Sequence, residues 1–246
     1  MVGMWKLILV IFLAATSFSA SYGQSIETDA SSRLEHGKGL LDAGKTDEAV
    51  EVFNQVMESG STTLALYYRG MAFSVKGWQG LAIKDYTEAI KQDPGQAVYY
   101  ARRGISRLSL GDVSEAILDL NKALELEPSS SSVMSFRSRA LMMSGRPNQA
   151  LDDINRAIQI NPSNSGFFKL RGDILTSTGN YDKAVNDYDR AIQINPGFAA
   201  AFNNRGIALA HINKVKEAVD DLNAAMDLAS SRSGNVRGSG FPTTPW

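Results

Sequence analysis

The sequence predicts an all-α protein built as a solenoid of antiparallel helix pairs, and three observations predict it. Small residues recur on a 34-residue period through most of the 246 residues. The segments between them carry apolar side chains at a spacing near 3.6 residues, the period of an α-helix. The composition, 43% hydrophobic and 21% charged with seven prolines, is that of a folded soluble protein.

Residues 1–23 precede the periodic region and have the pattern of an export signal. Lys6 leads into an apolar run, Leu7 to Ala15, and then into small and hydroxylated residues, the order of a secretory signal peptide. The run is about half as long as the roughly 20 residues that span a bilayer as a helix. Cleavage at the end of this segment leaves residues 24–29 as a linker. The alternative is an uncleaved membrane anchor made of residues 5–18.

Three kinds of small or rigid residue carry the 34-residue period. A small residue occupies the first slot: Gly70, Gly104, Ser138, Gly172 and Gly206. Alanine occupies two further slots, one with Ala82, Ala116, Ala150, Ala184 and Ala218, the other with Ala89, Ala123, Ala157, Ala191 and Ala225. Proline closes the repeat at Pro94, Pro128, Pro162 and Pro196. Internal repeats therefore organise the chain.

Each repeat is expected to hold two helices of about 14 residues. A glycine follows the first helix at Gly77, Gly111, Gly145 and Gly179. A helix end favours a residue that tolerates positive φ at this point. The prolines end the second helix, because the residue before a proline is kept out of the α region. Small side chains let the helix axes approach closely, and larger ones would overpack at about 1–3 kcal/mol each.

These residues resemble the tetratricopeptide repeat family, which has a small residue at position 8, alanine at positions 20 and 27, and proline at position 32. The resemblance covers residues 30–232 and divides them into six repeats: 30–62, 63–96, 97–130, 131–164, 165–198 and 199–232. The first repeat is one residue short, with Val56 and Ser61 in place of an alanine and the proline. Terminal repeats stack on one neighbour only, so departures are expected there. The resemblance implies a right-handed superhelical solenoid.

Two charged series run through the five full repeats. Arginine stands at position 7 and aspartate at position 23: Arg69, Arg103, Arg137, Arg171 and Arg205, with Asp85, Asp119, Asp153, Asp187 and Asp221. Position 7 lies on the first helix and position 23 on the second. We therefore expect a structural ladder, in which each arginine pairs with an aspartate of its own or the preceding repeat. The alternative is a basic groove of ligand-binding arginines, but the regular occurrence of both signs favours the ladder.

The resemblance also implies a binding surface, because the first helices of such arrays line a concave groove. The candidate partner-binding residues at the family's groove positions are Tyr67, Tyr68, Met71, Arg102, Phe136, Arg139, Lys169, Asn203 and Asn204. Aromatic residues, arginine and methionine are enriched at protein interfaces. The alternative is that some of these side chains only pack between adjacent first helices. The family's carboxylate clamp is not matched, because Asp173 stands where an asparagine is required.

Composition and motifs exclude several classes of function. The 25 Lys and Arg against 26 Asp and Glu give a net charge of −1, which does not suit a nucleic-acid-binding surface. The absence of cysteine removes thiolate chemistry and disulfides, and the two histidines, His36 and His211, lie far apart. Acidic pairs such as Asp152 and Asp153 are explained by the ladder and by solvent. The sequence has no phosphate-binding loop, nucleophile elbow or H-E-x-x-H motif. It therefore predicts no enzyme activity, cofactor, metal or small-molecule substrate.

These observations together predict a non-catalytic scaffold or adaptor that binds a segment of a protein partner in the groove. The signal segment predicts export, to the periplasm or out of the cell, after cleavage. The alternative is a membrane-anchored assembly subunit that keeps its N-terminal hydrophobic segment. The sequence does not identify the partner.

Residues 233–246 are rich in glycine, serine and proline and are predicted to be a disordered tail. No amphipathic helix follows repeat six, so an apolar face of its second helix is left open. Two arrangements cover that face: Phe241 and Trp246 fold back onto it, or two copies form a homodimer through it. The sequence leaves both open.

Overall fold

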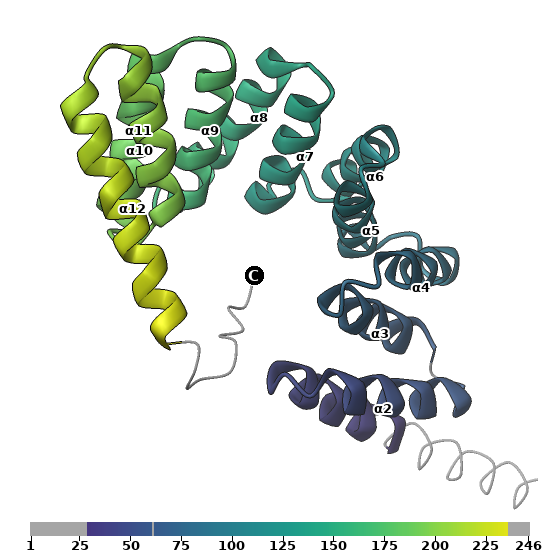
Figure 1. Cartoon of the computed structure of the whole chain (residues 1–246). Coiled ribbons are helices and arrows are strands. Elements are labelled where there is room, and N and C mark those ends of the chain that lie inside the picture. Colours follow the sequence, from purple (N-terminus) through teal and green to yellow (C-terminus); the bar gives the residue numbers. More distant parts are fainter. Residues whose placement is uncertain (1–28, 61, 236–246) are drawn as a thin grey trace, which may run out of the picture. The chain divides into compact units, whose positions relative to one another are not determined.

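A computed structural model describes residues 29–60 and 62–235 of the chain (Figure 1), and within them every regular element is an α-helix. The prediction of an all-α helical repeat solenoid is confirmed. The predicted signal segment, residues 1–23, lies outside the described residues, as does the linker except for Asp29, which is already helical. The predicted tail lies outside them from residue 236 onward.

The chain divides into two compact units between Pro94 and Gly95. In the described part of the first unit, a helix over residues 29–42 is followed by α2 (Thr46–Glu58), α3 (Thr63–Val75) and α4 (Gln79–Gln92). The second unit contains α5 (Ala97–Leu110), α6 (Val113–Leu126), α7 (Ser131–Met143), α8 (Pro147–Ile160), α9 (Ser165–Ser177), α10 (Tyr181–Ile194), α11 (Ala199–His211) and α12 (Val215–Asn235). Within each unit, consecutive helices pack against each other.

The helices begin and end where the 34-residue period places them. The first helices of five repeats start at Thr63, Ala97, Ser131, Ser165 and Ala199. The prediction for the turn after the first helix is also confirmed, since Gly77, Gly111, Gly145 and Gly179 all have φ between 74° and 84°. Asn213 occupies this turn in the last repeat and has φ 61° without being glycine. Asparagine tolerates this region better than most residues, so it ends α11 in the same way.

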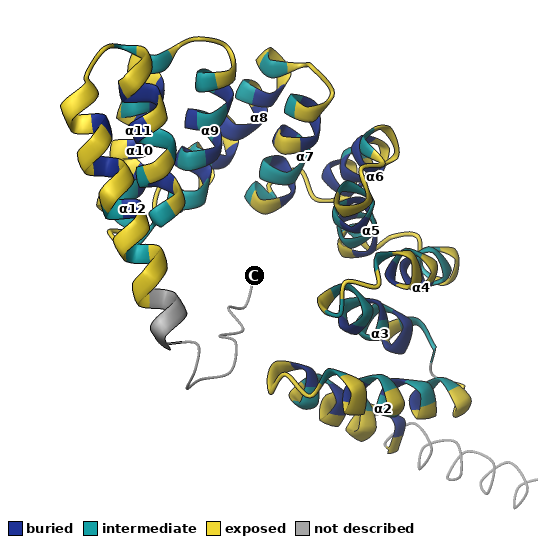
Figure 2. Ribbon diagram, in the orientation of Figure 1, coloured by how far each residue is buried: buried dark blue, intermediate teal, exposed yellow. Residues whose placement is uncertain are grey.

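The core of each pair of helices is built on the small residues of the period. Ala82, Ala116, Ala150 and Ala184 are fully buried, and Figure 2 shows buried residues along the sides by which paired helices face each other. Ser138 replaces glycine in the middle repeat, and its hydroxyl donates to the Ala150 carbonyl oxygen at 2.7 Å. The hydrogen bond satisfies a polar group that would otherwise be costly to bury.

The last helix is the longest in the described part of the chain. α12 has 21 residues, whereas the second helices α4, α6, α8 and α10 each have 14. It runs to Asn235 and so extends past residue 232, where the sequence placed the end of the array and the start of a disordered tail. A helix propagates at little cost once formed.

Candidate functional site: a charged ladder and the first-helix faces

Each arginine of the ladder pairs with the aspartate of its own repeat. The Nε and Nη2 atoms of Arg137 donate to the two carboxylate oxygens of Asp153 at 2.6 and 2.7 Å. The same two-bond pairing joins Arg69 to Asp85, Arg103 to Asp119, Arg171 to Asp187 and Arg205 to Asp221. Such bidentate pairs are the strongest form of ion pair, since geometry and charge act together. They fix the first helix of a repeat on its second helix.

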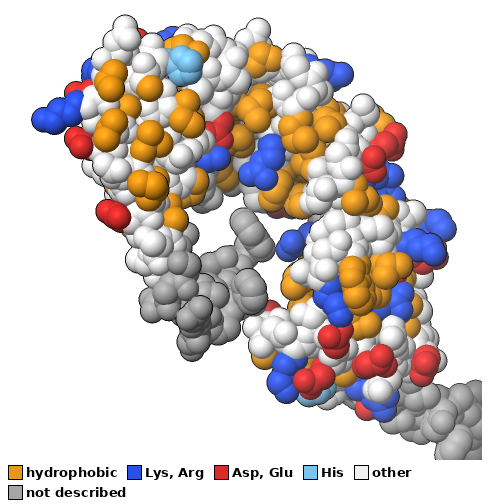
Figure 3. Space-filling model, in the orientation of Figure 1, with side chains coloured by type: hydrophobic (Ala, Val, Ile, Leu, Met, Phe, Trp, Pro, Cys, Tyr) orange, Lys and Arg blue, Asp and Glu red, His pale blue; other side chains and the backbone are white. Residues whose placement is uncertain are grey.

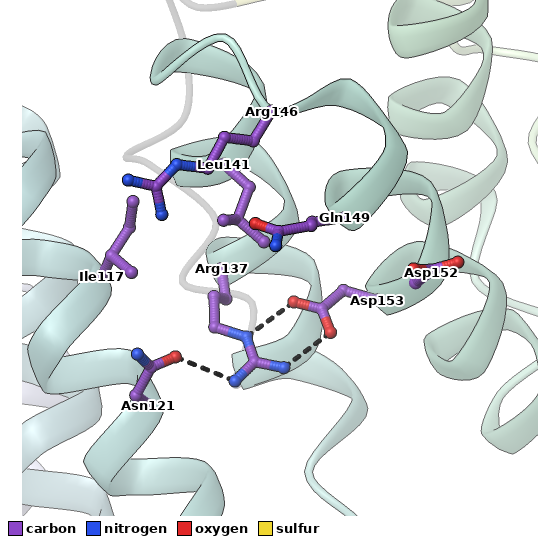
Figure 4. A pocket seen from close by; sticks show the side chains of 8 residues that line it. All are labelled: Ile117, Asn121, Arg137, Leu141, Arg146, Gln149, Asp152 and Asp153. Atoms are coloured by element: carbon purple, nitrogen blue, oxygen red, sulfur yellow. Dashed lines mark hydrogen bonds and ion pairs between the residues drawn. The ribbon is translucent and has the colours of Figure 1, made fainter.

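The third donor of the guanidinium reaches the preceding repeat. Arg137 Nη1 donates to Asn121 Oδ1 at 2.9 Å, so one side chain bridges α6, α7 and α8 (Figure 4). The equivalent bonds run from Arg69 to Asn54, from Arg171 to Asn155 and from Arg205 to Asp189. These acceptors stand at position 25 of their repeats and were missed in the sequence. Position 25 does not keep one residue type, because Thr87 and Asp189 stand where the other repeats have asparagine. A polar residue of varying type on a helix resembles a solvent-facing one.

The aspartates of the ladder are buried and the arginines are partly buried. Asp153 is 4% exposed, so its carboxylate depends on the arginine for compensation. The hydrogen bonds from the guanidinium groups to Asp85, Asp187 and Asp221 raise the pKa of Arg69, Arg171 and Arg205. These arginines are therefore charged at any physiological pH. Their N–H donors bond to groups within the fold, so few of these donors remain for an external ligand.

In the first unit, the candidate residues Tyr67, Tyr68 and Met71 all lie on α3 and are half-buried. Tyr68 stacks on Phe53 with 5.9 Å between ring centroids, and Tyr67 meets Tyr68 edge-on at 4.9 Å. Met71 packs against the apolar cluster that contains Phe53. Much of this surface is therefore used in packing α3 against the preceding helices.

In the second unit, the candidate residues lie on the first helices α5, α7, α9 and α11. Neighbouring first helices contact each other. We call the surface that these four helices form together the first-helix face. Arg102 on α5 and Arg139 on α7 have no carboxylate partner among the described residues. The Arg139 guanidinium lies 5.7 Å from the centroid of the Phe136 ring. These two charges are available to a ligand, in contrast to the ladder arginines.

The remaining candidates of the second unit belong to a polar network centred on Asp173. Its carboxylate accepts from Lys169 Nζ at 2.7 Å and from Asn204 Nδ2 at 2.7 Å. Tyr188 also donates its hydroxyl to Asp173, at 3.0 Å, and burial raises the pKa of Tyr188 well above its ordinary value of 10.0. Asn203 is exposed and donates to Asn204. The structure thus joins Lys169 and Asn204, from adjacent repeats, through Asp173, which stands at a groove position and breaks the carboxylate-clamp motif.

The ladder explains the acidic pairs of the sequence. Asp153 and Asp221 are buried against arginines, whereas Asp152 and Asp220 are exposed. His211 stacks on Tyr181 with 4.3 Å between ring centroids. Within residues 29–60 and 62–235, no three histidine, aspartate or glutamate side chains converge to hold a metal ion. No helix in this described part has the length and apolar character needed to cross a membrane.

Helix pairs that repeat every 34 residues and pack on their neighbours place the chain in the class of helical repeat proteins, which use extended surfaces for binding. The family model described as "Tetratricopeptide repeat" matches residues 34–97 and 101–165, and a second, described as "TPR repeat", matches residues 172–213. The chain belongs to the tetratricopeptide repeat family. This family is typically a non-catalytic scaffold for interactions between proteins.

Several solved structures share the fold. A crystal structure of MamA is 27% identical, covers 67% of this chain and 96% of its own, and has a TM-score of 0.60. YrrB, described as a TPR protein with an unusual peptide-binding site, is 21% identical, covers 76% and 97%, and has a TM-score of 0.58. PilF of Pseudomonas aeruginosa is 19% identical, covers 87% and 95%, and has a TM-score of 0.68. The comparison with curated proteins gave no match.

Proposed function

We propose that the protein is a non-catalytic scaffold whose first-helix face, in the second unit, binds a segment of a protein partner. The observation that carries the proposal is the contrast between two kinds of arginine. The ladder arginines are held by buried aspartates, whereas Arg102 and Arg139 have no carboxylate partner among the described residues. The description of YrrB as a peptide-binding protein of the same fold supports binding of this general kind.

The chemistry of this face indicates what kind of segment it takes. Phe136 offers a half-buried ring beside the Arg139 guanidinium, and Met143 is 51% exposed on the same helix. An aromatic ring, a flexible methionine and an unpaired arginine together suit a segment with an apolar anchor next to a carboxylate. On α11, Asn203 offers an exposed amide that can bond to the backbone of an extended segment.

A comparison of three proteins tests the proposal. The parent chain, the variant Phe136→Asp with Arg139→Glu, and the control Arg156→Glu would be crosslinked in cells and purified with their partners. Arg156 is exposed on the second helix α8 and gives the same change of charge as Arg139→Glu. We expect the parent and the control to recover the same partners. The variant Phe136→Asp with Arg139→Glu, called the groove variant, should lose these partners while its thermal unfolding transition stays unchanged. Identical partner lists for all three would contradict the proposal.

We also propose that the chain is exported and cleaved, on the support of the pattern in residues 1–23. The rival arrangement, in which the hydrophobic segment is kept and anchors an assembly subunit, falls on residues outside the described ones. Mass spectrometry of the N-terminus separates the two. A chain that begins at Gln24 supports export with cleavage, and a chain that keeps Met1 contradicts it.

A further inference from the structure

The second helix of the last repeat carries an apolar stripe that has no cover among the described residues. Its four members are exposed by 38–63%: Val215, Val219, Leu222 and Met226. They follow each other at spacings of four, three and four residues and therefore share one side of α12. Figure 3 shows hydrophobic side chains in rows over α11 and α12. A contiguous exposed apolar patch commonly marks a site of interaction with another protein or segment.

The equivalent stripe of α6 shows what such a surface does when it has a neighbour. Ile117, Leu120 and Leu124 stand three periods before Val219, Leu222 and Met226, and they are at most 8% exposed. They belong to one apolar cluster with Val133, Met134 and Leu141 of α7. α7 is joined to α6 by a short turn and runs back along it. This kind of stripe therefore takes an antiparallel apolar helix.

We propose that the stripe of α12 is covered by α12 of a second copy of the chain, in an antiparallel two-fold pair. The spacing of four, three and four residues reads the same in both directions. An antiparallel pair centred between Asp220 and Asp221 therefore places Val215 against Met226 and Val219 against Leu222 of the other copy. A two-fold interface needs this self-complementarity, because the same surface must serve both partners.

The charges beside the stripe fit the same arrangement. Lys216 and Asp227 are exposed, and neither has an ion-pair partner among the side chains described, those of residues 29–60 and 62–231. At the helical step of about 100° per residue, both lie on the same edge of the stripe. In the antiparallel pair, this edge of one copy lies beside the same edge of the other copy. Measured along the helix axis, Lys216 of one copy is then about 3 Å from Asp227 of the other. Two symmetric ion pairs therefore flank the apolar contact.

The absence of cysteine from the sequence allows a direct test of this geometry. In the proposed pair, residue 219 lies about 4.5 Å along the axis from its own counterpart, and residue 226 about 16 Å. We therefore expect Val219→Cys to form a disulfide-linked dimer on mild oxidation and Met226→Cys not to. A mixture of Val215→Cys and Met226→Cys should crosslink, because these positions face each other. Leu118→Cys, which is equally exposed on α6, is the matched control and should stay monomeric.

Association in solution supplies the second measurement. A contact between two helices is small for a specific interface, so we expect sedimentation to show a monomer that approaches twice its mass as concentration rises. Met226→Asp should abolish this increase, and Leu118→Asp should leave it unchanged. Lys216→Glu or Asp227→Lys alone should weaken association about tenfold, and the two together should restore it.

Several results would overturn the proposal. One is a parent chain that stays monomeric at all concentrations and yields no crosslink from Val219→Cys. Another is crosslinking of Met226→Cys to itself, which would indicate a parallel pair. A monomer that dimerises only after Phe241→Ser and Trp246→Ser would assign the stripe to the C-terminal segment of the same chain. The groove variant proposed above leaves α12 untouched, so a failure of one proposal is distinguishable from a failure of the other.

Discussion

Gly172 and Tyr188 occupy a single layer of the core, and each residue restricts the other. A β-carbon added to Gly172 would lie 2.6 Å from Tyr188 Cε1, closer than any carbon contact allows. The tyrosine ring is 1% exposed, and its hydroxyl is held by Asp173 and Thr176, so the ring has little freedom to move away. The same couple recurs in Gly70 with Tyr86 and in Gly37 with Phe53. The middle repeat has Ser138 with the aliphatic Ile154.

We expect Gly172→Ala to lower the free energy of unfolding by about 1–3 kcal/mol, the range for overpacking a core. Gly104→Ala is the matched control, because its nearest side-chain atom is Leu120 Cγ at 3.1 Å, and we expect a smaller loss. Chemical denaturation measures both. Gly172→Ser combined with Tyr188→Ile reproduces the match of the middle repeat, so its loss should be smaller than the sum of the two single changes. Equal losses for both alanine variants would contradict the steric account.

The ladder is tested by a double-mutant cycle on Arg137 and Asp153. Arg137→Met leaves a buried carboxylate without its main partner, and we expect a loss of about 3–5 kcal/mol in the free energy of unfolding. Asp153→Leu leaves the arginine with Asn121 alone. The double variant should lose less than the two single variants together, because neither charge then remains buried. Additive losses, measured by chemical denaturation, would show that the pair is not energetically coupled.

The bond between repeats is tested separately at Asn121. Asn121→Ala removes the acceptor that Arg137 reaches in the preceding repeat, and we expect a loss of about 1 kcal/mol. Asn121 and Gln149 both line a pocket between α6, α7 and α8 (Figure 4). No hydrogen bond of the Gln149 side chain is found among the described residues. Gln149→Ala should therefore stay within about 0.5 kcal/mol of the parent. If both changes cost the same, the bond contributes nothing beyond a polar side chain at the surface.

Burial of Tyr188 predicts a loss of stability in alkali. Its pKa is raised in the folded state, so above the ordinary value of 10.0 the unfolded chain loses this proton while the folded chain keeps it. Stability is then fully present below pH 10 and falls as pH rises above it. Other groups also titrate there, so the informative quantity is the difference between the parent and Tyr188→Phe. The variant should lose less stability between neutral pH and pH 11, and parallel pH profiles would contradict the prediction.

The helix pairs were predictable because each carries its own local signals. Gly111 and Gly179 mark the end of the first helix, and Pro128 and Pro196 follow the end of the second, so no long-range information is needed. The division between Pro94 and Gly95 was not predictable. The sequence there has the same proline that stands at the other junctions, and nothing local distinguishes it.

The sites were predictable in part. The arginines and aspartates of the ladder stand out because residue type and spacing both repeat. The acceptors Asn121 and Asp189 were missed, since their role depends on a side chain in the next repeat. The network of Asp173 with Tyr188 and Asn204 was missed for the same reason, because residues 173 and 204 meet only after two repeats have stacked. Spacing identifies a repeated contact, whereas a contact made once leaves no periodic trace.

The ladder makes bonds between neighbouring repeats, whereas each pair of an aromatic ring and a glycine lies within one repeat. This difference determines what is needed for the array to change its length. The couple of Gly172 and Tyr188 lies within one 34-residue block, so a block that is duplicated or deleted carries its own core match with it. The ladder bond at the junction between two repeats accepts more than one residue type. Arg171 and Arg205 require only an oxygen acceptor at one position of the block before them, and Asn155 and Asp189 both supply it. A block that is gained or lost therefore keeps its internal core match, and each new junction has to remake the ladder bond and the apolar contact between neighbouring repeats.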